Sequence, residues 1–340
     1  METMESIEKP VAAARHPLDI PAGVIRRLQA RLKRSVKGRD EVIDLILIAL
    51  MADGHVLLED YPGSGKTTLA KTLGESIIDD VEEDEIPSFR RIQFTPDLLP
   101  SDITGVSVFD VDSASFHFRR GPIFAYVVLG DEINRTSPKV QSAMLEAMAE
   151  KQVTVDNVSY PLNDLFFVIA TQNPLDLAGT FPLPVAQLDR FLFKVRMDYI
   201  AREAEIDVVN NRIAGNPVRE EDLPKVRRGE IVDARRAMEE HVKVNANVST
   251  CLVDIARSIR ANPKVMQGIS TRSLVLMVPA LKAAALMRGR DYVTDDDVKW
   301  LAPYVFSHRL SLAPGVVEPH AVVKECSKEA VEALSRATLK

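Results

Sequence analysis

Cysteine is scarce in this chain, which has 340 residues but holds only Cys251 and Cys326. The two stand far apart, and neither has a second Cys or a His at the short spacing of a zinc-ligand pair. One pair of cysteines also cannot build the disulfide framework of a small secreted protein. The sequence therefore predicts neither a zinc site nor a disulfide-stapled fold, and we expect both thiols to be buried or chemically idle.

Long apolar runs are also missing. The longest near the start, Leu45 to Ala52, is far shorter than the roughly 20 residues that a helix needs to cross a bilayer. The first part of the chain also lacks the hydrophobic core of a signal peptide. We therefore expect a cytoplasmic protein without a membrane span.

Aromatic residues are few as well, and the chain has no excess of positive charge. Aromatics make up 6% of the chain, and 43 Lys and Arg face 49 Asp and Glu, for a net charge of -6. Such a composition disfavours a surface built to neutralise a nucleic-acid backbone or to stack on bases, although a local basic patch is compatible with it. The length and the 46% hydrophobic content predict about two globular domains with a sizeable core.

A glycine-rich turn is the strongest positive signal, and it lies between the apolar segment His55 to Leu58 and the helix-forming segment Lys66 to Ile77. Glycines without a Cβ let backbone N–H groups point at phosphates, and the helix that follows aims its positive dipole end at them. We predict a P-loop, with Lys66 on the β- and γ-phosphates and Thr67 on Mg²⁺. Asp60 stands where the full motif has glycine, but Asp also tolerates turn conformations. The nucleotide-binding residues expected in this loop are Pro62, Gly63, Ser64, Gly65, Lys66, Thr67 and Thr68.

Polar side chains follow the apolar runs that come later in the chain. Asp131 and Glu132 come directly after one such run, and adjacent carboxylates there are either a helix cap or a catalytic pair. Given the upstream loop, we expect Asp131 to hold Mg²⁺ and Glu132 to orient or deprotonate the attacking water, a role worth roughly 10² to 10⁴ in rate. Asn173 would contact the γ-phosphate or the water, or else only satisfy a turn. Arg190 would serve the site, or else only pair with Asp189.

The apolar pattern predicts an α/β core with two inserts. Helical stretches separate most of the short apolar segments, as the winding of a parallel sheet requires. The alternating stretches Val106 to Ile123 and Gln152 to Leu162 predict β-hairpins inserted in that core. The five predicted strands are His55–Leu58, Arg91–Thr95, Ala125–Leu129, Phe166–Ala170 and Phe193–Arg196.

The remaining segments complete a predicted division into a mobile leader (1–23), a core (24–197) and an all-helical lid (198–340). Helical periodicity begins at Val24, breaks around Gly38, and returns through Glu41 to Met51. Gly38 is also expected to contact the nucleotide. The helices predicted after Asp198 are Arg202–Arg212, Ala234–His241, Ser249–Arg260, Arg272–Arg288, Thr294–Ser307 and Ala321–Ala337.

These motifs, taken in order, resemble those of MoxR-type AAA+ ATPases, in the branch that includes magnesium-chelatase ATPase subunits and replicative helicase motors. The resemblance spans roughly residues 24 to 311. The segments that carry it are Glu59–Thr67, Phe94–Gly105, Asp131–Arg135, Thr171–Pro174, Gly179–Pro184, Ala186–Phe191 and Arg288–Val293.

The resemblance implies an α/β P-loop NTPase core with a five-stranded parallel sheet and hairpin inserts, followed by a smaller all-α lid. It also implies hydrolysis of ATP, with Mg²⁺, between the subunits of a homohexameric ring. Asn173 then becomes the sensor 1 residue and Arg272 the sensor 2 residue. Arg190 becomes the arginine finger that reaches a neighbouring subunit's γ-phosphate, worth 10³ to 10⁵ in turnover.

The resemblance further implies a chaperone-like role, in which a client protein is remodelled or receives a metal or cofactor, with a von Willebrand factor A domain protein as partner. Alternatives are a magnesium-chelatase-like motor subunit, a nucleic-acid motor, and a non-hydrolysing ATP-bound scaffold. The acidic hairpin tips at Asp112 and Asp156 disfavour nucleic acid as a partner, and Glu132 disfavours the scaffold.

Four residues depart from the family pattern: Val185 stands where a Glu is usual, Leu177 and Ala178 where acidic residues are usual, and Phe181 where a Tyr is usual. These departures bear on the expected subunit junction and not on the ATP chemistry.

Overall fold

The computed structural model describes residues 16–61, 63–80, 86–174, 179–213 and 223–338. Most of the predicted leader falls outside these residues. Within them, helix α1 (Asp19–Ser35) begins before Val24, where we had expected the first helix. Pro21 fits in its first turn, because the N–H that proline lacks would have no partner within the helix there.

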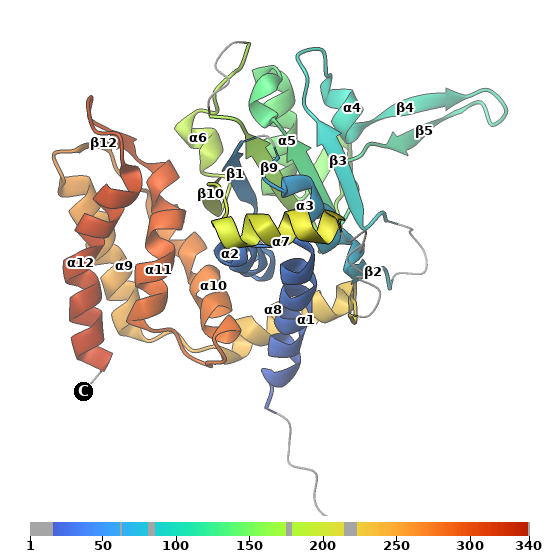
Figure 1. The fold of residues 1–340 in the computed structure, drawn as a ribbon. Coiled ribbons are helices and arrows are strands. Elements are labelled where there is room, and N and C mark those ends of the chain that lie inside the picture. The colour runs from blue at the N-terminus through green and yellow to red at the C-terminus, as the bar shows by residue number, and fades with distance from the viewer. Residues whose placement is uncertain (1–15, 62, 81–85, 175–178, 214–222, 339–340) are drawn as a thin grey trace, which may run out of the picture.

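A five-stranded, all-parallel sheet forms the centre of the molecule, in the order β10-β1-β9-β6-β3 (Figure 1). All five predicted strands are confirmed. Because the strands are parallel, their carboxyl ends meet at one edge of the sheet, where open α/β sheets bind ligands. The strands are β1 (Val56–Asp60), β3 (Phe89–Gln93), β6 (Val127–Asp131), β9 (Phe167–Gln172) and β10 (Phe193–Met197).

Both faces of the sheet are covered, and successive residues of a strand point to opposite faces. In β1, Val56 and Leu58 join one hydrophobic cluster while Leu57 joins the other. The first cluster takes in α1, α2 (Asp40–Met51) and α3 (Lys66–Glu75). The second takes in α4 (Pro100–Thr104) and α5 (Pro138–Glu150).

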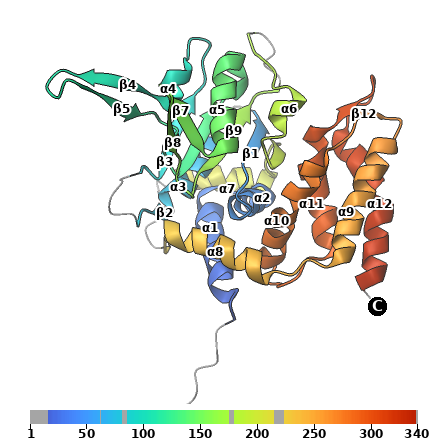
Figure 2. The ribbon, with the colours of Figure 1, turned by 180° about the vertical axis from the view of Figure 1, so that it is seen from behind.

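Two hairpins are inserted in this core, as predicted. They are formed by β4 (Gly105–Asp110) with β5 (Ser115–Arg120), and by β7 (Gln152–Val155) with β8 (Val158–Pro161). The β4–β5 arm projects from the body on the side away from helices α9 to α12 in both views (Figures 1 and 2).

One face of the arm carries a row of aromatic rings. Near its base Phe118 stacks on Tyr160 of the second hairpin, with ring centroids 3.8 Å apart. Nearer the tip, Phe109 and Phe116 pack on each other but are 50% and 71% exposed. The outer half of the arm therefore exposes an aromatic pair next to its acidic tip.

The chain after the sheet is mainly helical, and the six predicted helices are present. Three strands of two or three residues were not predicted, because so short a segment cannot display an alternating pattern. Among them β11 (Val226–Arg227) pairs with β2 (Ile77–Ile78) of the core, and β12 (Val265–Gln267) pairs with β13 (Ser311–Leu312). The helices are α7 (Arg202–Ile213), α8 (Arg228–His241), α9 (Ala246–Ala261), α10 (Thr271–Met287), α11 (Asp295–Phe306) and α12 (Pro319–Thr338).

The lid helices are tied to the core by packing. Helix α8 packs on α1 and α10 packs on α2, so residues of lid and core share one hydrophobic cluster. Within the described segments, none of the helices has the combination of length and apolar character that crossing a lipid bilayer requires. Cys251 and Cys326 are both buried free thiols.

Candidate functional site

The predicted P-loop connects β1 to α3 at the carboxyl edge of the sheet. Asp60 is the last residue of β1 and pairs with Met197, so it is extended and needs no glycine. Gly63 and Gly65 have φ values of +83° and +91°, which disfavour any residue with a Cβ. Gly65 precedes the first turn of α3, whose N–H groups have no partner within the helix and can bind an anion. Pro62 lies outside the described residues.

Asp131 lies at the centre of a charged network that joins three strands, β3, β6 and β9, to helix α3. Its Oδ1 atom is 3.0 Å from Lys66 Nζ and accepts a hydrogen bond of 2.8 Å from Thr171 Oγ1, while its Oδ2 atom accepts from Arg91. Burial of the carboxyl, which is 2% exposed, raises its pKa. The bonds from Lys66, Arg91 and Thr171 outweigh that effect and hold the pKa of Asp131 below its usual range. The side chain is thus a buried, ionised carboxylate beside the P-loop lysine.

These residues fit a magnesium ion. Mg²⁺ in nucleotide sites takes one or two protein oxygens and completes its shell with phosphate oxygens and water. Thr67, in the first turn of α3, and Asp131 offer that small ligand set. No larger group of three or more His, Cys, Asp or Glu side chains that could hold a metal occurs among the described residues.

Glu132 has a strained backbone that fixes its carboxylate. The residue is in the left-handed region, with φ 59° and ψ 50°, a conformation that costs a non-glycine residue about 1 kcal/mol or more. Its N–H donates to Thr171 Oγ1 at 2.9 Å, and its Oε2 atom accepts from Arg135 Nε at 3.1 Å and Gln93 Nε2 at 3.2 Å. The side chain stays 24% exposed, so a water molecule can reach a carboxylate that is already oriented.

Asn173 comes directly after β9, and β9 lies between β1 and β6 in the sheet. The half-buried Asn173 therefore emerges between the P-loop on one side and the Asp131–Glu132 pair on the other. Lys66 and Asp131 are in direct contact, and Thr67, Glu132 and Asn173 lie at the same edge. The carboxyl edge of the sheet thus brings these five predicted residues into one site.

A cavity of about 480 Å³ opens beside the P-loop, with room for the nucleoside part of a nucleotide. Lys37 and Arg39 line this cavity, but Gly38 between them does not, so its expected contact with the nucleotide stays a prediction. Sequence reasoning did not assign two aromatic rings, Tyr61 and Tyr199, which stack with centroids 5.8 Å apart in the cavity wall. The P-loop residues that line the cavity are Gly63, Ser64, Gly65 and Thr68.

Arg190 and Arg272 lie away from the carboxyl edge of the sheet, where the other predicted site residues meet. Arg190 is three residues before Phe193, which pairs with Val56 at the start of β1. The P-loop follows the end of β1, so the four intervening steps of strand separate the two levels by about 13 Å. Arg272, at the start of α10, has its Nε atom 3.9 Å from Asp189 Oδ2. Neither arginine is therefore near the phosphate cradle of its own chain.

The alternative in which Arg190 only forms an ion pair with Asp189 is wrong. The side chain of Arg190 has no hydrogen-bond or ion-pair partner within the part of the chain that the structure describes, so it does not pair with Asp189. Instead Arg309 Nε donates to Asp189 Oδ1 at 2.7 Å.

Arg309, in the 3₁₀ turn η3 (Ser307–Arg309), is a residue that sequence reasoning missed. Its side chain is 2% exposed, and besides Asp189 it donates to the carbonyl oxygens of Phe191 at 2.7 Å and Leu192 at 3.1 Å. These three acceptors flank Arg190. No local pattern marks Arg309, because its partners are distant in sequence and meet it only in the fold.

Comparison with known protein families gives two matches. Residues 55–193 match the ATPase family associated with various cellular activities (AAA), and residues 257–326 match an AAA lid domain. The first match covers four of the five strands of the sheet and the site at their ends. The second covers the end of α9, all of α10 and α11, and the start of α12.

Several known proteins are similar over most of their length. YeaC of Bacillus subtilis (strain 168) is 44% identical over 298 residues, which are 86% of this chain and 90% of that protein. Chaperone MoxR1 of Mycobacterium tuberculosis is 36% identical over 301 residues, which are 85% of this chain and 76% of that protein. A solved structure from Cytophaga hutchinsonii, described as a candidate ATPase, superposes with a TM-score of 0.81 at 31% identity, over 92% of this chain and 96% of that one.

Proposed function

This chain belongs to the MoxR family of AAA+ ATPases, and from that membership we propose that it is a Mg²⁺-dependent ATPase that works as a hexameric ring and remodels or matures a client protein. The observation that carries the proposal is the 3.0 Å contact between Lys66 Nζ and Asp131 Oδ1. It joins the phosphate-binding loop to a buried, ionised carboxylate, and a site that hydrolyses ATP needs both.

The chemistry begins with the phosphates. Backbone N–H groups around Gly63 and Gly65 and at the start of α3 bind them, and Lys66 exchanges its contact with Asp131 for the β- and γ-phosphates. Asp131 and Thr67 would hold Mg²⁺. When bound, the ion neutralises charge that builds on the transferred phosphoryl group.

Water activation is assigned to Glu132. Its strained backbone and its bonds to Arg135 and Gln93 fix the carboxylate in place, while its exposure lets water in. Asn173 emerges beside it and positions the water or the γ-phosphate. Both residues pre-orient the reacting groups, which is where most of the rate gain in phosphoryl transfer arises.

The two remaining arginines are assigned to the neighbouring subunit's nucleotide. Arg190 lies about 13 Å along the sheet from its own P-loop, and Arg272 reaches Asp189 beside it. Each therefore serves the site only in a ring, where one subunit completes the next. Val185, five residues before Arg190, and Phe181, which is 43% exposed, would make apolar contacts at the subunit junction where the family has polar residues.

We assign a client protein as the target of the motion that ATP hydrolysis drives. One relative is named Chaperone MoxR1, and we extend that role to this chain, with a von Willebrand factor A domain protein as partner. Arg272 and Arg309 of the lid both bind Asp189. A change at the arginine surface after hydrolysis therefore moves the lid, and this motion would act on the client.

Two measurements test this function. Isothermal calorimetry with Mg²⁺ should detect ATP binding to the wild-type chain and much weaker binding to Lys66→Ala. A chain that takes up no ATP would end the proposal. A pull-down with Glu132→Gln, held in its ATP state, should then capture the client that normal turnover releases.

A further inference from the structure

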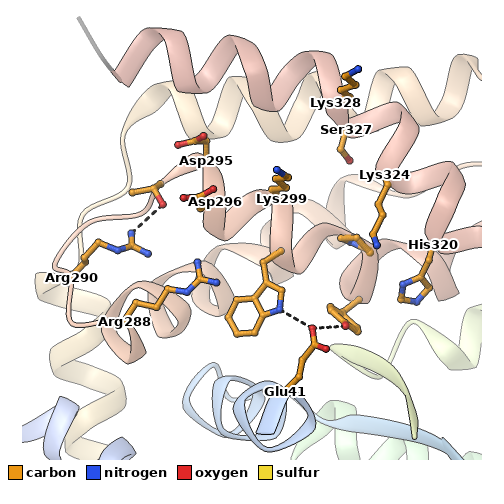
Figure 3. Close-up of a pocket in the computed structure, with 14 residues that line it drawn as sticks. Glu41, Arg288, Arg290, Asp295, Asp296, Lys299, His320, Lys324, Ser327 and Lys328 are labelled. Atoms are coloured by element: carbon orange, nitrogen blue, oxygen red, sulfur yellow. Dashed lines mark hydrogen bonds between the residues drawn. The ribbon is translucent and has the colours of Figure 1, made fainter. Parts of the chain in front are cut away.

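A second large cavity, of about 1010 Å³, lies in the lid, away from the P-loop (Figure 3). Helices α11 and α12 and the first turn of α2 enclose it. Trp300 and Tyr304 lie on its α11 side, and both donate to Glu41 Oε1, at 3.2 Å and 2.7 Å. The Arg288 guanidinium lies 4.5 Å from the centroid of the Trp300 ring. The wall is therefore aromatic and rigidly held.

Three lysines line this cavity: Lys299 on α11, and Lys324 and Lys328 on α12. All three are exposed, and none has an acidic partner within 4.0 Å in the part of the chain that the structure describes. Lys324 and Lys328 are also four residues apart on one helix face, a like-charge spacing that is unfavourable. Acidic residues outnumber basic ones 49 to 43 in the chain, so partners are not scarce. The group forms a positive surface.

Asp295 and Asp296 precede Lys299 by four and three residues on α11 and offset part of its charge, but the other charges of the cavity do not offset Lys324 and Lys328. Arg288 and Arg290 both bind the buried Asp297. Glu41 is engaged by the two aromatic donors. Asp295 and Asp296 lie with Arg290 at the end of the cavity opposite Lys324 (Figure 3). The cavity therefore has a positive end, beside an aromatic wall.

We propose that this cavity is the docking site for an acidic peptide segment of a partner or client protein. Its carboxylates would bind Lys299, Lys324 and Lys328, and an apolar side chain would pack against Trp300 and Pro303. The assignment of that segment to a client or partner rests on the proposed function, whereas the acidic-peptide chemistry rests on the cavity alone.

A peptide fits better than a small phosphate. The volume is at the upper end for small-molecule pockets, which are about 300–1,000 Å³. Phosphate sites commonly use a free helix N-terminus, but at the start of α11 the Asp297 carboxylate accepts from Thr294 N–H at 2.9 Å and places a negative charge there. Asp295 and Asp296 add negative charge there. What remains is three flexible ammonium groups spread over two helices, which suit several separated carboxylates.

Binding of a peptide in this cavity would affect the nucleotide site through helix α2. Glu41 is in the first turn of α2, and Arg39, just before that helix, lines the cavity beside the P-loop. A peptide that displaces the Trp300 ring alters its bond to Glu41, and so the position of α2. We therefore expect peptide and ATP to change each other's affinity, as linkage requires.

Trp300 supplies the experiment, because it is the only tryptophan in the chain and it lines the cavity. The full-length protein, without nucleotide, is titrated with a tryptophan-free peptide of alternating glutamate and leucine while Trp300 fluorescence is recorded. The same peptide with glutamine for glutamate is the matched ligand. The acidic peptide should give a saturable change at concentrations below about 1 mM that weakens with added salt, and the glutamine peptide should not.

The matched variants are two triple substitutions. Lys299→Gln with Lys324→Gln and Lys328→Gln should raise the Kd of the acidic peptide roughly tenfold. The control removes the same charge from exposed lysines elsewhere, through Lys71→Gln, Lys139→Gln and Lys225→Gln, and should leave the Kd within about twofold. Thermal unfolding of both variants verifies that they are folded.

Four outcomes would overturn the proposal. They are no saturable response to the acidic peptide, an equal response to both peptides, equal losses in the two triple variants, and tighter binding of inorganic tripolyphosphate than of peptide. Trp300 fluorescence that depends on protein concentration without peptide would assign the cavity to a second copy of the chain instead. Calorimetry with ATP is run in parallel, so failure of the ATPase proposal appears separately from failure of this one.

Discussion

Arg309 and Asp189 lie 120 positions apart in the sequence, and their side chains form an ion pair with Nε and Oδ1 2.7 Å apart. Arg309 also holds the carbonyl oxygens of Phe191 and Leu192. Arg309 of the lid therefore binds the short segment that carries Arg190 both before and after that residue. If Arg190 completes a neighbouring subunit's site, the orientation of its side chain depends on Arg309 of the lid.

Arg309→Lys should leave ATP binding intact and lower turnover at least about tenfold. Lysine keeps the charge but is a single point donor, and it cannot serve three acceptors in the fixed geometry of a guanidinium. ATP binding and steady-state ATPase activity measure this, with the exposed Arg336→Lys as the control. Mixing with Lys66→Ala subunits should restore activity, because those subunits supply an intact Arg190. A variant that had merely lost stability would not recover on mixing.

Glu132→Gln should bind ATP as the wild type does while turnover falls at least about 100-fold, the scale of losing a general base. The substitution keeps the shape of the side chain and its hydrogen bonds to donors. Single-turnover measurements with Mg²⁺ separate the chemical step from binding. The exposed Glu146→Gln, on α5, is the matched control. Undiminished turnover in Glu132→Gln would remove this residue from the mechanism.

Arg190→Ala alone should form rings that bind ATP and do not hydrolyse it. Lys66→Ala should be inactive for a different reason, the loss of phosphate binding. In mixed rings some interfaces pair an intact P-loop with an intact Arg190, so activity should reappear and pass through a maximum as the ratio is varied. Absence of recovery at every ratio would contradict action across subunits.

His55 is a buried imidazole at the start of β1, and its two nitrogens are both used. Nδ1 accepts from Val168 N–H at 3.1 Å, and Nε2 donates to the Met148 carbonyl oxygen at 3.3 Å. Burial lowers the pKa of His55 from 6.5 to about 4. Three charged side chains also act on this pKa: Asp53, Lys151 and Arg235.

The pH dependence of stability follows from that shift. Because the folded pKa of His55 is below the unfolded value, its contribution is fully present above pH 6.5 and is lost as the pH falls towards about 4. The free energy of unfolding should drop by about 3 kcal/mol over this window. Urea unfolding at several pH values should show a flatter profile for His55→Gln, and an unchanged one for the partly exposed His241→Gln. An identical slope in His55→Gln would refute the assignment.

Local patterns predicted the parts of the fold that are themselves local. Gly63 and Gly65 predicted a turn, and Asp131 and Glu132 predicted the polar end of a strand, because the sheet edge and the helix start are each set by neighbouring residues. The polar end of the next strand also made Asn173 a candidate, and the resemblance then supplied its role as sensor 1.

Contacts between distant segments were not predictable in this way. Arg91 binds Asp131 only because β3 and β6 are neighbours in the sheet, and Arg309 binds Asp189 only because the lid folds back on the core. The pairing of β2 with β11 was not predicted, for the same reason. Charged residues at such positions look like any surface Arg until the strand order and the lid packing are known.

The β4–β5 arm leads to a different consequence. Its outer half, with Phe109 and Phe116, supports neither hydrophobic cluster of the body. Substitutions there should leave the melting temperature nearly untouched, so a change at this tip need not cost the fold any stability. A change of binding preference within the family would be easiest to acquire at the end of this arm.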